Sequence, residues 1–348
     1  MTFAVLGAGN TGQAITSYLS MNGEQVKLYC RDKHKAEKLS LLGLKLQGIY
    51  QGEVTIDASD DLEYVVGNTT KYIIITTTAF GHESILKKLK PLLQDKQTIA
   101  LFPGYWGAVE AINILGDLIS TKNITIAETS AMPFVSKADN EGSVFINKIK
   151  SNVLISAIST SKISQTFLNA FPQLKPTKSI FETSLNNTNV VVHTPITLFN
   201  ASRIDAPEAF QFYGQGVSPR TVSYIEKLDA ERMAIASVLN IQTKDILTLL
   251  NEFYGGTYSS LYEALPGLFP EGMAPNTLNH RYVTEDIPFG LVPISELGKK
   301  VGLYTPYTDC LIDTASLLME RNFREEGVSF ETWDKADILA YGSLAEQV

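Results

Sequence analysis

The chain has 348 residues, which predicts about two domains and a sizeable buried core. Its net charge of −8 argues against nucleic acid and anionic membranes as partners, because both bind to basic surfaces, and we expect neither. With Cys30 and Cys310 as its two cysteines, it predicts neither a disulfide framework nor a thiolate metal cluster, and we expect no metal site.

The first predicted strand, Thr2–Leu6, is not preceded by a basic or leader-like apolar segment. No apolar run approaches the roughly 20 residues that span a bilayer. We therefore expect a cytoplasmic protein.

A glycine fingerprint follows this strand directly, and a helical pattern and a second strand, Gln25–Tyr29, come after it. Strand, G-x-G-x-x-G, helix and strand in this order are the context that a dinucleotide-binding fingerprint needs. The first glycine permits the turn, the second lets the backbone approach a pyrophosphate, and the third lets helix and strand pack closely. The helix start also offers free N–H groups to phosphates. The predicted cofactor-binding residues are Gly7, Gly9, Asn10, Thr11 and Gly12.

The end of the second strand bears on the choice of cofactor. NAD enzymes usually carry a carboxylate there, whereas an arginine suits the 2′-phosphate of NADP. This strand ends at Cys30, and Arg31, Lys33 and Lys35 follow it. We favour NADP, contacted by Arg31, over NAD. In the alternative interpretation Asp32 caps a solvated basic helix, which is compatible with either cofactor.

The loops after the next strands are expected to face the ligands, since ligands of open α/β sheets lie beyond the carboxyl ends of the strands. Thr76 is predicted to contact the cofactor, and Tyr105 and Phe134 to shape the substrate pocket. His82 is expected on the surface of the next helix, outside the site. The remaining strands are predicted at Tyr72–Thr76, Thr98–Phe102, Ile124–Ala127, Val144–Ile155 and Leu174–Ile180.

The strand pattern stops after about residue 184, so we expect a Rossmann domain over residues 1–184 and an all-α domain over residues 185–348. The expected helices are Asn189–Ser202, Ser218–Leu239, Asp245–Phe253, Pro293–Val301, Thr308–Arg321 and Phe330–Tyr341.

A candidate catalytic histidine lies in Asn189–Asp205, NVVVHTPITLFNASRID. Polar residues recur there every three positions, which predicts a mostly buried helix. We expect it to open close to Pro195, because proline is tolerated in a first helical turn. His193 would then lie at the mouth of this helix and in the cleft between the domains, where ligand sites concentrate. A hydrogen-bonded core histidine is the alternative.

Two stretches of the second half are dense in special residues: FQFYGQGVSPRTVSYIEKLDAER from Phe210 and NHRYVTEDIPFGLVPISELGKKVGLYTP from Asn279. Together with the glycine fingerprint and the His193 segment, they resemble the opine dehydrogenases of the octopine/nopaline dehydrogenase family over nearly the whole chain. The resemblance implies an α/β Rossmann domain followed by an all-α catalytic and substrate domain of 6-phosphogluconate-dehydrogenase-like helical architecture.

The resemblance also implies the reaction. Members of that family condense an amino acid with a 2-oxo acid such as pyruvate and reduce the imine with NAD(P)H to an N-(1-carboxyalkyl) amino acid. By position in the matching motifs, His193 and Asp286 would be the catalytic pair. A histidine can accept and donate a proton near neutral pH, and a carboxylate on its second nitrogen fixes the tautomer. The alternative for Asp286 is a cap for the helix near Pro288.

Substrate contacts are implied for two further residues. Arg281 is placed to bind the oxo-acid carboxylate, for which its planar fork is suited, with a surface ion pair as the alternative. Asn200 either orients substrate or bonds within its helix. Pro133–Lys137 departs from the family pattern, which leaves the amino-acid specificity open.

Two other functions fit parts of the sequence. A ketopantoate-reductase-like enzyme would act on an oxo acid without an amine, but it relies on a lysine where this chain offers His193. A non-catalytic NADPH-binding sensor would need the glycine fingerprint and not the His193–Asp286 pair. The expected partners are small-molecule substrates, and a homodimer is considered by analogy with other helical domains of this layout.

Overall fold

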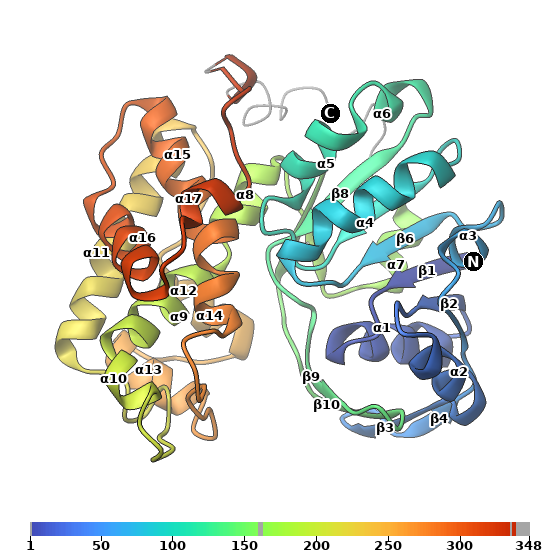
Figure 1. Cartoon of the computed structure of the whole chain (residues 1–348), viewed down its shortest axis with the longest axis horizontal. Helices are drawn as coiled ribbons and strands as arrows, with labels where there is room; N and C mark the ends of the chain where they lie inside the picture. The colour runs from blue at the N-terminus through green and yellow to red at the C-terminus, as the bar shows by residue number, and fades with distance from the viewer. Residues whose placement is uncertain (1, 159–162, 335, 339–348) are drawn as a thin grey trace. The chain divides into compact units, whose positions relative to one another are not determined.

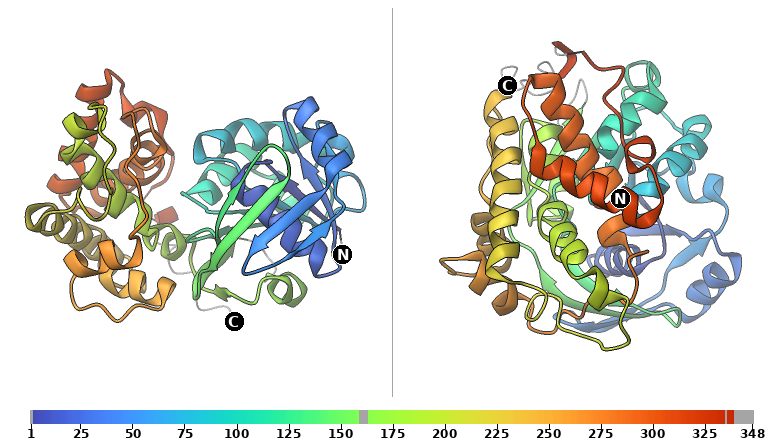
Figure 2. Two further views of the ribbon diagram at one scale, coloured as in Figure 1. Left: turned by 90° about the horizontal axis from the view of Figure 1, so that it is seen from below. Right: turned by 60° about the vertical axis from the view of Figure 1, so that its left-hand side comes forward.

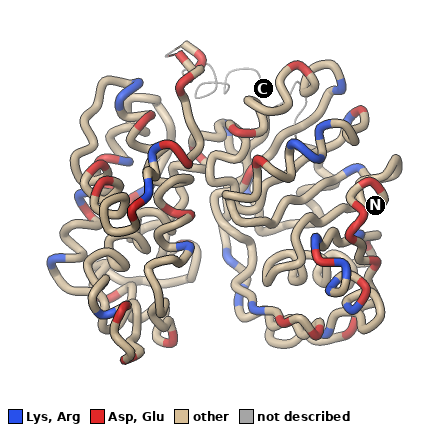
Figure 3. Tube along the Cα trace, viewed as in Figure 1, with Lys and Arg blue, Asp and Glu red and all other residues tan. Residues whose placement is uncertain are grey.

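The computed structural model describes residues 2–158, 163–334 and 336–338 (Figure 1). These residues fold as two units, Met1–Ile180 and Phe181–Val348. Acidic and basic residues are interspersed along the described parts of both units (Figure 3). No described helix has the length and apolarity required to cross a membrane.

The first unit is built on an eight-stranded sheet in the order β12-β11-β8-β7-β6-β1-β2-β5, with helices on both of its faces (Figure 2). All neighbouring pairs are parallel except β8 and β11. The order reverses between β1 and β6, which makes the carboxyl ends of these two strands the switch point where doubly wound sheets bind ligands. The strands are β1 Thr2–Leu6, β2 Gln25–Tyr29, β5 Asp57–Ser59, β6 Tyr72–Ile75, β7 Thr98–Leu101, β8 Thr125–Thr129, β11 Val153–Ile158 and β12 Leu174–Pro176.

The central strands β6 and β7 are buried along their whole length, as expected where helices cover both faces of a parallel sheet. Tyr18 of α1 meets Phe171, just after α7, on one face. The helices of this unit are α1 Asn10–Met21, α2 Lys33–Leu42, α3 Leu62–Val66, η1 Ala79–Gly81, α4 His82–Leu89, η2 Lys90–Leu92, α5 Gly107–Leu115, α6 Leu118–Thr121 and α7 Gln165–Ala170.

A second sheet of four strands, ordered β4-β3-β10-β9, was not predicted. The single strand expected over Val144–Ile155 is wrong, because the segment turns after Ile149 and divides between β10 in the small sheet and β11 in the large one. The turn is marked by the polar run Lys150-Ser151-Asn152, in which Asn152 has a φ of +55°, a signal that the prediction missed. The strands of the small sheet are β3 Leu44–Gly48, β4 Gly52–Val54, β9 Phe134–Ala138 and β10 Ser143–Ile149.

The second unit is helical, apart from an isolated bridge between Gln211 and Met273. Helix α9, Thr188–Phe199, packs against α11, α12, α14, α16 and η3, so nearly all of its side chains are buried. The other helices are α8 Ile180–Leu185, α10 Ala201–Ile204, α11 Pro219–Val238, α12 Ile246–Tyr254, α13 Leu261–Leu268, α14 Arg281–Thr284, the π-helical turn η3 Ile287–Leu291, α15 Val292–Val301, α16 Pro306–Met319 and α17 Phe323–Glu326.

The helix expected from Asn189 is confirmed, whereas its expected opening close to Pro195 is wrong. The helix begins at Thr188, where Asn187 caps it by accepting a hydrogen bond from the backbone N–H of Asn189. Pro195 lies inside the helix and cannot donate to the carbonyl of Val191, but the packing on all sides retains the helix. Of the terminal helix expected over 330–341, residues 330–334 are not helical, 336–338 are, and the rest lie outside the described residues.

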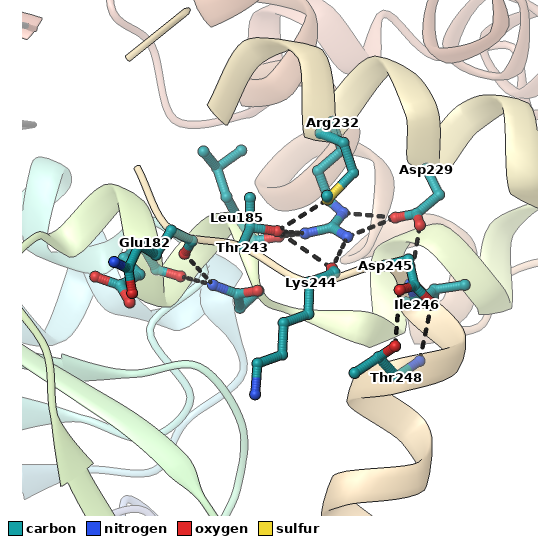
Figure 4. A network of polar contacts seen from close by, with 12 residues as sticks. Glu182, Leu185, Asp229, Arg232, Thr243, Lys244, Asp245, Ile246 and Thr248 are labelled. Carbon is teal, nitrogen blue, oxygen red and sulfur yellow. Dashed lines mark hydrogen bonds and ion pairs between the residues drawn. The ribbon is translucent and has the colours of Figure 1, made fainter. Parts of the chain in front are cut away.

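A buried arginine holds three segments of this unit together (Figure 4). Arg232 on α11 is 1% exposed and pairs with Asp229 one turn earlier. It also donates to the carbonyl oxygens of Leu185, at the end of α8, and Lys244. Asp229 in turn accepts from the backbone N–H of Ile246 at the start of α12. Both charges are thus compensated within the fold.

Candidate active site

The glycine turn lies at the switch point of the large sheet. Gly7 has a φ of +117°, a conformation that side chains with a Cβ rarely adopt, and its N–H donates to the carbonyl of Tyr29. The hydroxyl of Thr76, after β6, lies 3.1 and 3.0 Å from the carbonyl oxygens of Leu6 and Gly7. Thr76 therefore fixes the turn on which the cofactor would rest.

The other two glycines differ in what surrounds them. A Cβ on Gly12 would lie 1.6 Å from the carbonyl oxygen of Gly7, so only glycine fits where α1 crosses the turn. A Cβ on Gly9 would meet nothing within 4 Å. Gly9 is also the N-cap of α1 and no side chain caps the helix there. Open space above uncapped N–H groups fits the pyrophosphate of a dinucleotide.

The structure shows the contacts of Asn10 and of the basic residues that follow β2. The side-chain oxygen of Asn10 accepts from the backbone N–H of Ala138, so this amide ties α1 to β9. Thr11 follows it in the first turn of α1. Arg31 is exposed, and Asp32 caps α2 by accepting from the N–H of Lys35 at 3.1 Å. The capping interpretation of Asp32 is confirmed, and it is compatible with either cofactor.

Tyr105 and Phe134, the two predicted pocket residues of this unit, are buried in it. Phe134 is 3% exposed and its ring lies 5.0 Å from that of Tyr18 on α1. Tyr105 is 2% exposed and, like Trp106, has a left-handed backbone conformation. Their contact with substrate stays a prediction, and the packing of Phe134 favours a structural role.

His82 does not lie on the helix surface, so that expectation is wrong. It is 1% exposed at the start of α4, packed against the backbone of Gly107, and burial lowers its pKa to about 4. The Glu110 carboxyl lies 3.9 Å away, and burial raises its pKa to about 7. The first turn of α4 points inward because α4 packs against α5.

The helical unit brings His193 and Asp286 together although they are 93 positions apart. His193 lies in the middle of α9, and its Nδ1 is 2.8 Å from Oδ2 of Asp286. Asp286 is fully buried at the start of η3, where its side chain caps no helix, which excludes the predicted capping role. A carboxylate can only accept, so the Nδ1–H of the neutral ring donates to it.

Two tyrosines that the sequence did not single out complete the surroundings of His193. The hydroxyl of Tyr213 lies 3.0 Å from Nε2 of the histidine. The ring of Tyr282 is stacked on the imidazole, with the centroids 3.9 Å apart and an angle of 27° between the planes. The electron-rich face of a phenol stabilises a cation placed on it, so this stacking favours a protonated histidine. The sequence does carry a signal for both tyrosines, since each lies in one of the two stretches that begin at Phe210 and Asn279.

The other predicted substrate residues lie nearby in this unit. Arg281 is half-exposed, and its Nε lies 3.2 Å from Oε2 of Glu285, a carboxylate that is 2% exposed. The predicted ion pair is therefore present, although its carboxylate partner is buried. The amide nitrogen of Asn200 donates to the carbonyl oxygens of Ile196 and Gly216, which confirms bonding within its helix.

Comparison with known proteins identifies the family. The opine dehydrogenase of Arthrobacter sp. (strain 1C) is 33% identical over 98% of this chain and 97% of its own length. The chain belongs to the opine dehydrogenase family. It is thus an NAD(P)-dependent oxidoreductase that acts on CH–NH bonds, and its reaction class is the reductive condensation of an amino acid with an oxo acid.

Family models and solved structures agree with this membership. Residues 176–319 match the α-helical domain of NAD/NADP octopine/nopaline dehydrogenase, and residues 3–114 match ketopantoate reductase PanE/ApbA. Octopine dehydrogenase in complex with NADH and agmatine has a TM-score of 0.78 at 23% identity, covering 92% of this chain and 90% of that one. NADP⁺-bound yersinopine dehydrogenase has a TM-score of 0.75 at 14% identity, covering 98% and 97%. The predicted fold class, a Rossmann domain followed by an all-α domain, is confirmed.

Proposed function

We propose that this opine dehydrogenase condenses an amino acid with a pyruvate-like 2-oxo acid, with His193 as general acid and base and Asp286 as the residue that orients it. The observation that carries the proposal is the buried 2.8 Å contact between His193 Nδ1 and Asp286. The first unit would hold the dinucleotide and the second the catalytic and substrate-binding residues. When bound, the nicotinamide supplies the hydride that reduces the imine.

The proton transfers follow from the histidine environment. Forming the imine removes a proton from the attacking amine and delivers one to the departing hydroxyl, which leaves as water. A neutral His193 can accept the first proton through Nε2 and return it for the second. Asp286 on Nδ1 stabilises the intervening imidazolium, and the ring of Tyr282 lies against it.

Arg281 is the proposed partner of the oxo-acid carboxylate. Its side chain lies on α14, the helix that also places Tyr282 against His193. The ion pair with Glu285 limits the orientations of the guanidinium. An Arg281→Met variant is expected to raise KM for the oxo acid more than it lowers kcat, because the carboxylate would lose a charged partner.

NADPH is the proposed cofactor. Arg31 is exposed shortly after β2, where a cation suits a 2′-phosphate better than the two hydroxyls of an NAD ribose. Substituting Arg31 with Ala should raise KM for NADPH and leave KM for NADH nearly unchanged. Equal effects on both cofactors would contradict this preference.

The test of the reaction is cofactor oxidation with amino acids and 2-oxo acids, supplied separately and together. Oxidation that requires both substrates supports the condensation, whereas oxidation with an oxo acid alone would identify a simple reductase. His193→Asn should abolish turnover and leave cofactor binding intact. The matched control is His34→Asn, because the side chain of His34 is 96% exposed on α2. Normal turnover by the His193 variant would refute the assigned role.

A further inference from the structure

The two ring nitrogens of His193 both face protein groups. Nδ1 donates to Asp286, so the neutral ring carries its lone pair on Nε2, which can only accept. The group at Nε2 is the hydroxyl of Tyr213, at 3.0 Å. The nitrogen that must exchange protons with the substrate is therefore bonded to a tyrosine.

We propose that Tyr213 is a further catalytic residue, whose hydroxyl carries protons between Nε2 of His193 and the reacting amine and carbinolamine. The inference rests on the proposed function, since it requires His193 to be the acid and base. With this inference, the group that touches the substrate is the phenol of Tyr213 and not the imidazole of His193.

The packing of Tyr213 supports a fixed position. Its ring lies 4.6 Å from that of Phe269, and a Cβ on Gly272 would come within 2.8 Å of it. The backbone N–H of the preceding residue, Phe212, donates to the carbonyl of Gly272 at 2.7 Å. Tyr213 is 8% exposed. A side chain held on two sides retains its hydroxyl geometry, which a proton relay needs.

The electrostatics of the phenol suit a relay that is never itself ionised. Burial raises the pKa of Tyr213 well above its usual value, with smaller contributions from the neighbouring Tyr282 and Tyr254. The hydroxyl thus stays protonated and can donate to Nε2. As it passes its proton to Nε2, it takes one from the amine, and the reverse exchange delivers a proton to the departing hydroxyl.

The overall reaction also needs a proton from water. An ammonium substrate, a ketone and a hydride give a secondary ammonium and water only if one further proton is taken up. Asp286 is fully buried, and His193 and Tyr213 are 9% and 8% exposed. This proton therefore has to reach His193 and Tyr213 from solvent in each turnover.

The test is Tyr213→Phe, which removes the hydroxyl and keeps the ring. We expect kcat to fall by about 10²-fold or more, the range of a lost general acid or base, with a changed solvent isotope effect. Cofactor affinity should not change. The matched control is Tyr224→Phe, which loses a 2.7 Å hydrogen bond to the carbonyl of Tyr307 elsewhere in the unit and should keep its kcat.

The alternative is that Tyr213 only occupies the substrate position and withdraws on binding. Tyr213→Phe would then turn over as fast as the wild type, with an equal or lower KM, and the relay would be refuted. If that variant fails to fold, a proton inventory of kcat in mixtures of H2O and D2O with the wild-type enzyme decides, because the relay moves one proton to Nε2 and a second to the phenol oxygen in the same exchange. An inventory that fits a single transferred proton would equally overturn the relay.

The failures of the two proposals can be told apart. Turnover by His193→Asn refutes the acid and base role of His193, and the relay with it. An inactive His193→Asn beside a fully active Tyr213→Phe refutes the relay alone.

Discussion

Replacing Asp286 with Asn tests the contact on which the proposed chemistry depends. The substitution nearly preserves shape but removes the charge that faces His193 Nδ1 at 2.8 Å. An amide that turns its NH2 towards Nδ1 would also move the ring proton to Nε2. The histidine would then present a donor to Tyr213 where it now presents an acceptor.

The structure allows the loss to be estimated. Asp286 is fully buried, so the carboxylate acts on an imidazolium with little solvent between them. For charge centres about 4 Å apart at an effective dielectric constant near 20, the attraction is about 4 kcal/mol. Losing it where the imidazolium forms lowers kcat by about 10³-fold. The tautomer change adds to this loss.

The measurement is kcat for cofactor oxidation with both substrates saturating, together with cofactor affinity by fluorescence titration. We expect the affinity to be unchanged, because the dinucleotide is assigned to the other unit. Asp245→Asn is the matched control, since asparagine caps a helix as well as aspartate does and the Asp245 side chain bonds Thr248 at the start of α12. Wild-type turnover by the Asp286 variant would refute the role given to the carboxylate.

Three further predictions concern buried positions. Gly12→Ala should lose cofactor binding or the folded first unit, because its Cβ would meet the Gly7 carbonyl at 1.6 Å, whereas Gly9→Ala should fold normally and only bind more weakly; equal folding and binding of both would contradict this geometry. His82 binds its proton near pH 4 when folded and near its usual 6.5 when unfolded, so it contributes stability above pH 6.5 that is lost as pH falls towards 4. The free energy of unfolding is expected to fall by about 3 kcal/mol over that pH range because of His82. In urea unfolding, the free energy of unfolding of His82→Leu should therefore depend less on pH over the same range. Arg232→Met should destabilise the protein by about 3–5 kcal/mol, since it leaves the buried Asp229 unpaired, and a loss below about 1 kcal/mol would refute the importance of that pair.

The sequence determined those features whose physical causes are local. A strand followed at once by G-x-G-x-x-G needs no distant residue to become a dinucleotide turn, because the glycines themselves permit the positive φ at Gly7 and the close approach at Gly12. Ser218 followed by Pro219 likewise predicts the start of α11, since a cap and a proline act within one turn. The spacing of apolar residues also predicts the change from strands to helices, which is expected after about residue 184 and occurs at Ile180, where α8 begins.

Long-range packing decided the rest. His82 reads as a surface residue from its own helix, and only the docking of α5 buries it. The helix through Pro195 begins earlier than proline chemistry predicts, because contacts around α9 outweigh one lost hydrogen bond. The small sheet joins β3 to β10, which lie about a hundred residues apart in the chain.

The candidate active site likewise combines features that the sequence predicts with contacts that only the fold creates. The resemblance to a family points to His193 and Asp286, but it carries no signal for which group lies at Nε2. Tyr213 lies 20 residues beyond His193, and the packing of its ring against Phe269 and Gly272 brings its hydroxyl to the imidazole. The sequence gives the type of each residue. The hydrogen-bond partner of a polar side chain depends on chain segments that meet only in the folded unit.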